Sequence, residues 1–407
     1  MTHPAHAAGL KAYAEDRFED AAALFAEACA ASPNDVTCHY DHGRALFLLW
    51  RFAAAEAALR RALGIDPEHL QARAYLGRAV DGQGRLDEAV DCFREVLAGQ
   101  PDQAAVHLLL AQTLLHRGDF AEGWEEYEWR YGGEAGRPYP DFGVPQWNGE
   151  ALAGKTIFVL GEQGYGDTIQ FVRYVPMLKD LGAAVVFGCS QPLMRLLQPT
   201  PGIDRAVNNW PRPGSFDYFC PLSSLPRAFR TTTEAIPVET PYLAPKASLR
   251  RRWARRLDDV TGPHVGLCWQ GRPSHPNDRY RSIGLRPMID ALPAAAGYVS
   301  LQVGTDAEGA VVRVFDDKIG DFADTAALIA GLDLVITVDT SIAHLAGALG
   351  AEAWVLLPSV PDWRWRRTGE TCAWYPSLKL FRQSAPGDWA PVLTEVSAAL
   401  RDRFGLD

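Results

Sequence analysis

The chain has 407 residues, of which 47% are hydrophobic and 22% are charged, and this length suffices for two or three globular domains. It has no uncharged run of about 18 apolar residues, and its first residues lack a basic stretch followed by an apolar one. We therefore expect neither a membrane span nor a secretory signal. The seven cysteines are scattered and form no C-x-x-C pair. This pattern predicts reduced thiols in the cytoplasm and excludes a disulfide framework or a cysteine zinc site.

The negative charge is concentrated at the start of the chain. The net charge is −10, and residues 1–131 hold 12 Lys/Arg and 21 Asp/Glu, which leaves a net charge of only −1 for the remainder. An acidic surface suits a basic protein partner, and it also serves solubility alone. Because phosphate binding needs a basic stripe, we do not expect the chain to bind nucleic acid.

The first third of the sequence repeats with a period of 34 residues. Four kinds of position recur at this spacing, and they are Gly9, Gly43 and Gly77, then Ala21, Ala55 and Ala89, then Phe25, Leu59 and Phe93, and finally Pro33, Pro67 and Pro101. Each unit predicts two amphipathic helices that approach closely at the small residues, with the proline ending the second helix. A helical repeat of this length is the tetratricopeptide signature, and residues 5–102 strongly resemble that family.

A fourth, divergent unit extends the repeat region to about residue 131. It keeps the period at Gly118 but has Ala111 where the earlier units have glycine. A divergent last repeat is expected where a solenoid caps itself or docks onto another domain. Stacked helix pairs form a groove that commonly binds peptides, although such repeats also brace a neighbouring domain or form a homo-oligomer. Residues 132–150 are rich in glycine and proline and predict a linker.

From residue 155 onward, short β-branched runs alternate with helical stretches. The runs expected to be strands are 156–160, 184–189, 205–209 and 217–222 in a first sheet, and 264–271, 297–303, 333–339, 353–358 and 378–383 in a second. A helix is expected between the two groups, over residues 250–260. Strands connected by helices predict right-handed crossovers and parallel, doubly wound sheets. We therefore expect two Rossmann-like domains facing a cleft, over residues 151–248 and 249–407.

Ligands of such sheets bind beyond the carboxyl ends of the strands, and five polar, glycine-rich or aromatic segments occur there. They are residues 161–167, 269–282, 302–306, 338–344 and 357–366.

The first of these segments, GEQGYGD, contains Gly164, Gly166 and Asp167. Its glycines are spaced G-x-x-G-x-G, no acidic residue ends the second strand, and no Gly-Lys-Ser/Thr follows. These features exclude a dinucleotide fingerprint and a P-loop. The segment predicts a tight turn that opens a helix. Asp167 then either caps that helix or takes part in chemistry.

The segment VDTSIAHLAGALG places Asp339, Thr340 and Ser341 at the start of a helix and His344 one turn later. Free N–H groups and hydroxyls at a helix start suit a diphosphate. The alternative is an ordinary helix cap with a packed histidine.

Two further segments supply cations and aromatic rings. GRPSHPNDRYRSI carries Arg279 and Arg281, whose planar guanidinium groups suit phosphates, although a solvated charged loop explains them equally well. PDWRWRRTGETCAWYP carries Trp363 and Arg364. Its aromatic rings could stack on a sugar or a base, or they could seal the joint between the two domains.

Together these segments resemble the glycosyltransferase family that includes the bacterial heptosyltransferases (the family 9 type), and in particular its tetratricopeptide-fused branch. The resemblance rests on GEQGYGDTIQFVRYVPML, GLCWQGRPSHPNDRYRSI, DFADTAALIAGLDLVITVDTSIAHLAGALG and PDWRWRRTGETCAWYPSLKLFRQ. It implies a GT-B fold, in which an acceptor-side Rossmann-like domain precedes a donor-side one. It also implies an inverting, metal-independent transfer from a nucleotide-activated sugar.

The resemblance also implies roles for individual residues. Asp167 matches the aspartate that follows the glycine turn and acts as general base. The positions implied for donor and nucleotide binding are Gln302, Asp339, Thr340, Ser341, His344, Arg279 and Arg281. The positions implied for the acceptor side of the cleft are Gly164, Gly166, Gln170, Trp363 and Arg364. The arginine-rich loop stands where heptosyltransferases have a lysine-containing donor loop, which leaves the sugar open.

The expected function is therefore the transfer of a hexosyl, heptosyl or related sugar from a nucleotide-sugar to an acceptor hydroxyl. No other cofactor is expected. The fused repeats favour a protein or peptide acceptor, such as flagellin or another surface protein. The alternative is a non-catalytic scaffold that uses the same fold to hold a nucleotide or a partner protein.

Overall fold

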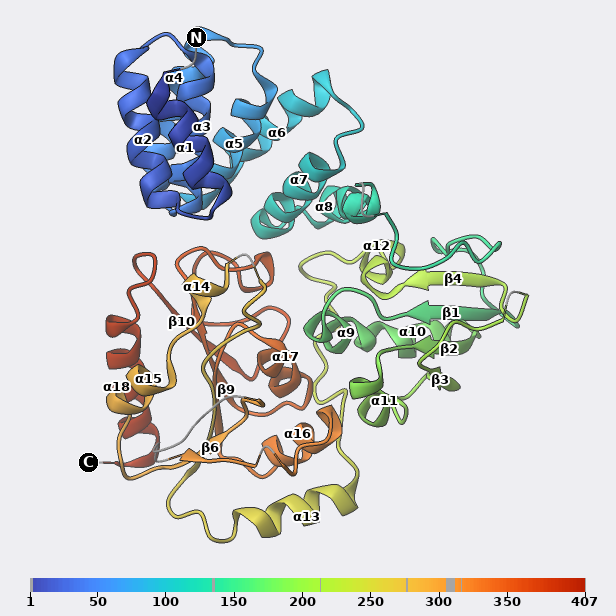
Figure 1. The fold of residues 1–407 in the computed structure, drawn as a ribbon. Helices are drawn as coiled ribbons and strands as arrows, with labels where there is room; N and C mark the ends of the chain where they lie inside the picture. Colours follow the sequence, from blue (N-terminus) through green and yellow to red (C-terminus); the bar gives the residue numbers. More distant parts are fainter. Residues whose placement is uncertain are drawn as a thin grey trace. The chain divides into compact units, whose positions relative to one another are not determined.

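The structure is a computed structural model that describes residues 3–133, 136–212, 214–275, 277–304, 312–315 and 317–406. The chain forms two compact units, residues 1–138 and 139–407 (Figure 1). No helix within the described ranges is long and apolar enough to cross a bilayer.

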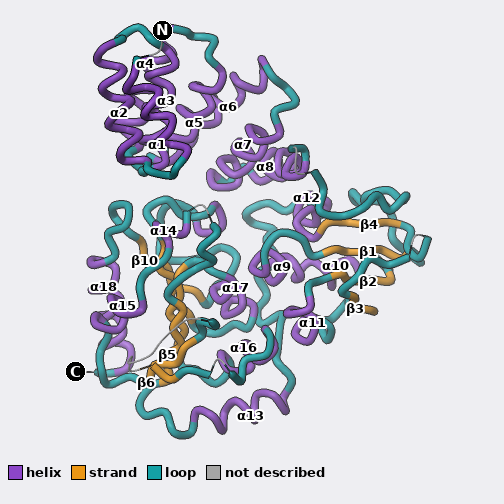
Figure 2. The backbone as a smooth tube through the Cα atoms, viewed as in Figure 1, coloured by secondary structure: helices purple, strands orange, loops and turns teal. Residues whose placement is uncertain are grey.

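The first unit is built from helices that pack against one another in chain order (Figure 2). They are α1 (Pro4–Ala14), α2 (Phe18–Ala31), α3 (Val36–Leu48), α4 (Phe52–Ile65), α5 (Leu70–Gly82), α6 (Leu86–Gly99), α7 (Ala104–Arg117) and α8 (Phe120–Tyr127), followed by the short 3-10 helix η1 (Glu128–Tyr131). The helix pairs fall where the 34-residue period predicts them.

The repeated glycines explain how closely the paired helices approach. Each lies against the large apolar residue found 16 positions later, and the pairs are Gly9–Phe25, Gly43–Leu59 and Gly77–Phe93. A Cβ added at Gly43 would lie 2.5 Å from Leu59 Cγ, and one added at Gly9 would lie 2.7 Å from the Phe25 ring. Only a residue without a side chain fits this seam, so the small residue and the large one of each repeat are matched in shape.

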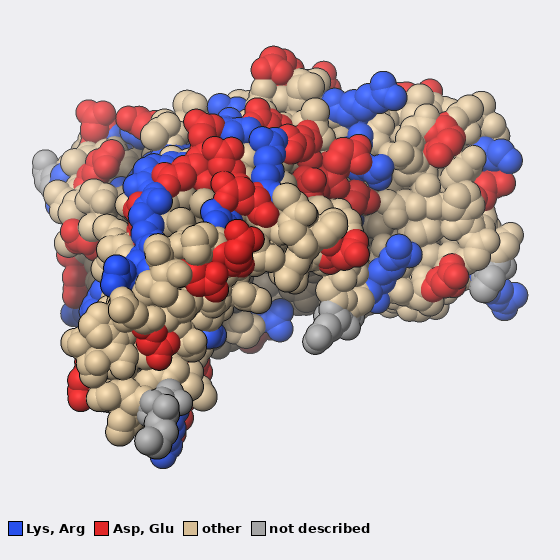
Figure 3. Space-filling view, turned by 90° about the horizontal axis from the view of Figure 1, so that it is seen from above, with Lys and Arg blue, Asp and Glu red and all other residues tan. Residues whose placement is uncertain are grey.

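Ion pairs join neighbouring repeats at the surface. Arg94 pairs with Glu122 at 2.7 Å, and Arg117 pairs with Asp87 at 2.8 Å. Acidic and basic side chains are interspersed on the face shown in Figure 3. Exposed pairs of this kind stabilise a fold by no more than about 1 kcal/mol each. The packing of the helices therefore contributes most of the stability of this unit.

The second unit contains two separate parallel sheets. The first sheet has strands β1 (Thr156–Leu160), β2 (Ala184–Gly188), β3 (Arg205–Val207) and β4 (Tyr218–Pro221), in the order β3-β2-β1-β4. Its helices are α9 (Tyr165–Phe171), η2 (Val172–Tyr174), α10 (Val175–Asp180), α11 (Gln191–Leu197), η3 (Leu222–Ser224) and α12 (Leu225–Ala228).

The second sheet has strands β5 (His264–Cys268), β6 (Gly297–Ser300), β7 (Val312–Arg313), β8 (Leu334–Val338), β9 (Ala353–Leu357) and β10 (Leu378–Arg382), in the order β10-β9-β8-β5-β6-β7. Helix α13 (Ala247–Leu257) precedes it in the chain. Its other helices are α14 (Asp278–Arg281), α15 (Leu285–Ala291), α16 (Phe322–Ile329), α17 (Ser341–Ala348), η4 (Trp363–Trp365) and α18 (Ala390–Phe404). Strands β8 and β9 are buried along their whole length, as expected for central strands covered on both faces.

The order of the strands identifies where ligands of these sheets would bind. In the second sheet, successive strands run outward in one direction from β5 and in the other from β8, which is the arrangement of dinucleotide-binding doubly wound folds. The first sheet reverses in the same way between β1 and β4. The predicted parallel sheets are confirmed. Strand β7 was not predicted, because two residues carry too little pattern to reveal a strand.

Part of the segment expected to be a linker packs onto the first sheet. Tyr139, Phe142 and Trp147 are buried. The Trp147 backbone N–H donates to Phe219 O at 2.8 Å, which extends the edge of β4. The glycines and prolines of this segment suggested a linker, but its three aromatic residues place it in the second unit.

Candidate functional site

The glycine turn after β1 opens α9, as predicted, and Asp167 lies in the first turn of that helix. Its Oδ2 accepts a hydrogen bond from the Gly164 N–H at 2.9 Å, so Asp167 does cap the helix. Its other oxygen, Oδ1, accepts from Arg364 Nη2 at 2.5 Å. The Asp167 side chain keeps 24% of its surface exposed. The cap therefore uses only one of the two carboxylate oxygens.

Arg364 lies at the centre of a small polar cluster. Its Nε donates to Gln170 Oε1 at 2.5 Å, and its Nη1 donates to Asp362 Oδ1 at 2.9 Å. Its guanidinium also stacks over the Trp363 ring, 4.2 Å from the centroid. Arg364 is 8% exposed, and two carboxylates neutralise its charge. Asp167 comes from the half of the second unit that contains the first sheet, and Asp362 comes from the half that contains the second sheet. The sequence suggested neither the pairing with Asp167 nor the role of Asp362.

The start of α9 lies directly against α17. A Cβ added at Gly166 would lie 2.7 Å from the His344 ring, so the glycine allows the two helices to meet. His344 is buried, and its Nδ1 shares a hydrogen bond of 2.9 Å with the Tyr375 hydroxyl. Burial, followed by the nearby charge of Arg364, lowers the pKa of His344 to about 3. Its imidazole is therefore neutral at physiological pH. At this point Gly166 and His344 pack against each other across the two halves of the second unit.

Arg173 is a buried arginine that was not among the candidate residues. Its hydrogen bonds join the two halves of the second unit. Arg173, in η2, donates from Nη1 to Trp374 O at 2.8 Å and to Pro237 O at 3.0 Å. Its Nη2 donates to the Tyr242 hydroxyl at 3.0 Å. Arg173 stands alone in an otherwise apolar run, which is the signal that could have marked it as a buried, fully bonded cation.

The start of α17 combines a capping residue with an unusual carboxyl group. The Thr340 hydroxyl accepts from the Ile342 N–H at 3.2 Å and caps the helix, and Ser341 is its first residue. Burial, followed by the negative charge of Asp362, raises the pKa of Asp339 to about 6. Diphosphate binding at this helix start remains a prediction.

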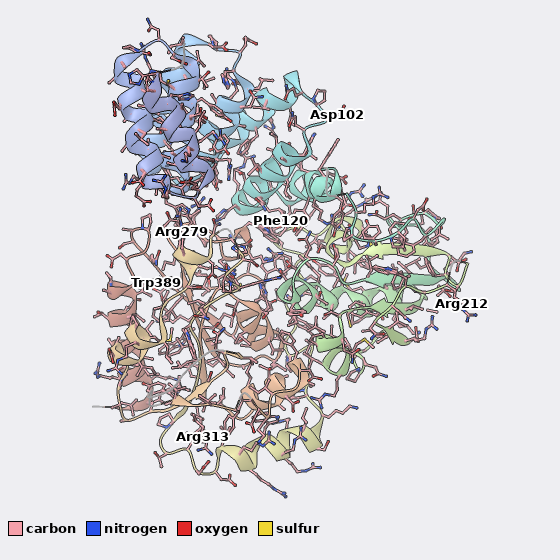
Figure 4. All side chains as sticks on the ribbon, in the orientation of Figure 1. Asp102, Phe120, Arg212, Arg279, Arg313 and Trp389 are labelled. Atoms are coloured by element: carbon pink, nitrogen blue, oxygen red, sulfur yellow. The ribbon has the colours of Figure 1, made fainter. Side chains whose placement is uncertain are left out.

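Arg281, one of the two candidate arginines, contacts this helix start. Its Nη1 donates to the backbone carbonyl of Asp339 at 3.2 Å. Arg279 lies on α14 (Figure 4) and is exposed. Its guanidinium stacks over the Tyr280 ring. These positions favour Arg281 as a cation beside the start of α17 and give Arg279 a peripheral place.

Gln302 is held at the end of β5. Its Oε1 accepts from the Gln270 N–H at 3.3 Å and from Cys268 Sγ at 3.4 Å. Cys268 Sγ also lies 3.6 Å from the Thr340 hydroxyl. The ends of β5, β6 and β8 are therefore linked by polar contacts at the point where the strand order reverses.

The aromatic side chains of the last candidate segment, PDWRWRRTGETCAWYP, are buried and pack against neighbouring rings. Trp363 is 4% exposed, and its ring meets that of Trp374 edge to face at a centroid distance of 5.9 Å. Trp365 and Tyr375 are buried beside His344. The Trp363 ring packs between Arg364 and Trp374, and its place on the acceptor side of the cleft stays a prediction.

Models of the tetratricopeptide repeat match residues 6–69, 46–112 and 82–123. The repeats predicted from the 34-residue period are therefore confirmed, and the matches extend into the fourth unit. Over nearly its whole length, the chain is similar to Protein FlbA of Caulobacter vibrioides. The two are 29% identical, in a match that covers 94% of this chain and 76% of FlbA.

Two solved structures are each similar to less than a third of this chain. MamA from Desulfovibrio magneticus RS-1 is 19% identical with a TM-score of 0.30, and the match covers 31% of this chain and 71% of MamA. The first tetratricopeptide domain of Spaghetti (RPAP3), solved with an HSP90 peptide, is 21% identical with a TM-score of 0.26, and the match covers 27% of this chain and 86% of that domain.

Proposed function

We propose that this protein is an inverting, metal-independent glycosyltransferase with a GT-B arrangement of its two sheets. The observation that carries the proposal is the contact between Gly166 and His344. It brings the helix start after β1 against the helix start after β8, and each of these strands flanks the reversal point of its own sheet. Two ligand-binding edges that meet in this way suit a donor on one sheet and an acceptor on the other.

In this proposal the second sheet binds the nucleotide-sugar. The start of α17 presents backbone N–H groups and the hydroxyls of Thr340 and Ser341, and Arg281 lies beside it. The departing nucleoside diphosphate gains negative charge in the transition state, so fixed donors and cations aimed at it accelerate the reaction. Arg281 and Arg364 supply positive charge without a metal ion.

Asp167 is the proposed general base. The acceptor hydroxyl oxygen forms a bond to the anomeric carbon of the sugar while the bond from that carbon to the diphosphate oxygen breaks. The hydroxyl proton passes to the Asp167 carboxylate, and the diphosphate leaves with the bonding electron pair. Attack from the face opposite the leaving group inverts the anomeric centre. Asp167 is the partly exposed carboxylate at the start of α9, and its Oδ2 is already oriented by the Gly164 N–H.

The substitution Asp167→Asn tests the assignment of the base. It keeps the size of the side chain but removes its basicity, so we expect the release of nucleoside diphosphate from nucleotide-sugars to fall by about 100-fold or more, while nucleotide still binds. A panel of nucleotide-sugars is incubated with each protein, and the diphosphate released is measured by coupled assay. Unchanged turnover in the variant rules Asp167 out as the base.

The repeats indicate protein partners, and we propose that they recruit a protein or peptide that carries the acceptor hydroxyl. Stacked helix pairs present a continuous groove of the size of an extended peptide.

A non-catalytic nucleotide-binding scaffold is the second candidate. The contact between the Phe171 and Trp374 rings and the bonds of Arg173 favour it, because both join the two halves of the second unit. Calorimetry with a panel of nucleoside diphosphates separates the two candidates when it is combined with the turnover assay. Binding without turnover of any sugar donor supports the scaffold.

A further inference from the structure

The position of Arg364 points to a role that goes beyond the lining of a cleft. It is the cation shared by the two ligand-binding edges, since it contacts Asp167 and Gln170 on α9. Its charge also acts on Asp339 and on His344, at the start of α17. A single buried guanidinium is therefore bonded to the proposed base, and its charge also acts on the proposed diphosphate site.

The contact between Arg364 and Asp167 conflicts with the proposed chemistry as it stands. Asp167 Oδ1 already accepts from Arg364 Nη2 and Oδ2 already accepts from the Gly164 N–H, so each oxygen of the proposed base is occupied before an acceptor hydroxyl arrives. The same contact engages the Nη2 donor of Arg364, and a guanidinium N–H of this kind also suits a phosphate oxygen. If Arg364 exchanges Asp167 for a phosphate oxygen, Asp167 can accept a proton and Arg364 can bind the phosphate.

We propose that the diphosphate of the nucleotide-sugar takes Arg364 from Asp167, so that the base becomes active only after the donor has bound. This inference rests on the proposed glycosyltransferase function and adds the order of its steps. A nucleoside diphosphate carries more negative charge than one carboxylate and offers several oxygens to the planar guanidinium. Donor binding thus pulls Nη2 away from Asp167 Oδ1 and leaves that oxygen to accept the proton of the hydroxyl.

The surroundings of Arg364 keep it within reach during this exchange. Asp362 Oδ1 holds its Nη1 at 2.9 Å, and Gln170 Oε1 holds its Nε, so two of its anchors remain when the contact with Asp167 is lost. Gln170 is fully buried, and its Nε2 has no partner among the described residues. A buried amide donor beside the arginine is a further group that a phosphate oxygen could satisfy.

The exchange predicts opposite effects of the two substitutions on nucleotide affinity. Removing the cation in Arg364→Gln weakens the binding of a nucleoside diphosphate, by about tenfold or more, because a charge-assisted contact is lost. Removing the competing charge in Asp167→Asn strengthens it several-fold, since Arg364 no longer has to leave a carboxylate. The double variant binds like Arg364→Gln alone, because Asp167 affects affinity only through Arg364.

The experiment is calorimetric titration of the full chain with UDP, GDP, ADP, CDP and dTDP, for the wild type and the three variants. Arg195→Gln is the matched control. Arg195 also joins the two halves of the second unit, through Asp321 at 2.7 Å, but it lies on α11 and its carboxylate partners are Asp321 and Asp324 instead of Asp167 and Asp362. Its loss should leave affinity unchanged. Arg364→Lys replaces Arg364→Gln if the latter does not fold, and a thermal melt of each variant decides this.

The outcomes separate this inference from the proposed function. Tighter binding in Asp167→Asn and weaker binding in Arg364→Gln support the exchange. If the wild type binds a nucleoside diphosphate and Asp167→Asn binds it equally or more weakly, the exchange is wrong while the donor site stands. If the wild type binds none of the five, the donor site and the exchange are both wrong. If Asp167→Asn binds more tightly but keeps its turnover, the exchange stands and Asp167 is not the base.

Discussion

Asp339 and His344 show how burial at one helix start acts on two kinds of titratable group. The pKa of His344 falls to about 3 and the pKa of Asp339 rises to about 6, because in each case the charged form loses contact with water. His344 is therefore an uncharged hydrogen-bonding group, and it cannot serve as a cation for a diphosphate. Its place in the donor site stays a prediction, in which the imidazole is a neutral group.

The raised pKa of Asp339 predicts a pH dependence of stability. The folded chain holds the Asp339 proton up to about pH 6, whereas the unfolded chain releases it near pH 4. The free energy of unfolding therefore falls as the pH rises between these two values. We expect Asp339→Asn to be more stable than the wild type at pH 7 to 8, by at most about 3 kcal/mol, and no more stable below about pH 4. The bond from Arg281 goes to the backbone carbonyl and is kept in the variant.

Urea unfolding of both proteins from pH 3.5 to 8 measures this difference. A difference that stays constant over the whole range shows that Asp339 titrates normally.

At the scale of the element, the helix pairs of the first unit depend on the contact between small and large residues. Gly43 lies within α3, where alanine would be the better helix former by about 1 kcal/mol. The sequence nevertheless has glycine there, because Leu59 of α4 occupies the space that a Cβ would need. Packing between the two helices outweighs the propensity of one of them.

We expect Gly43→Ala to destabilise the first unit by about 1 to 3 kcal/mol, because the added methyl group overpacks the seam with Leu59. The matched control is Gly64→Ala, in α4 of the same repeat. A Cβ at Gly64 meets nothing within 4 Å, so this change should leave stability unchanged or raise it by up to about 1 kcal/mol. Thermal unfolding followed by the helical signal at 222 nm compares them. Equal melting temperatures for the two variants contradict the role of the seam.

At the scale of the whole molecule, the chain joins an acidic helical unit to a unit with two parallel sheets. Residues 1–131 carry 21 of the 50 acidic residues, whereas the proposed chemistry lies entirely in the unit that begins at residue 139. Each unit has its own core, which is the ordinary condition for a domain to fold alone. Partner recruitment and sugar transfer are therefore expected to be separable.

Deleting residues 1–131 tests this separation. We expect the shortened protein to bind nucleoside diphosphate with an affinity within about twofold of the full chain, and to hydrolyse a nucleotide-sugar at a similar rate. Transfer to the protein acceptor should be lost, because the repeats no longer recruit it. Calorimetry, a coupled diphosphate assay and mass spectrometry of the acceptor measure the three properties. Transfer that persists at the full rate assigns acceptor binding to the second unit instead.

The sequence by itself determined the features that depend on local periodicity. The 34-residue repeat, the nine longer strands and the capped start of α9 follow from the spacing of small, apolar and turn-forming residues, which neighbouring positions reveal. The two-residue strand β7 and the packing of residues 139–150 on the first sheet lacked such a signal.

Only the tertiary structure decided which distant side chains meet. Arg364 lies 197 positions from Asp167, and Arg173 lies 201 positions from Trp374, so neither pairing leaves a trace in local spacing. The close approach of α9 and α17 near the first pairing depends on the absence of a side chain at Gly166. The residues of the candidate site could be predicted because they follow strands. Their partners could not, because a buried charge takes whichever opposite charge or carbonyl the packing brings to it.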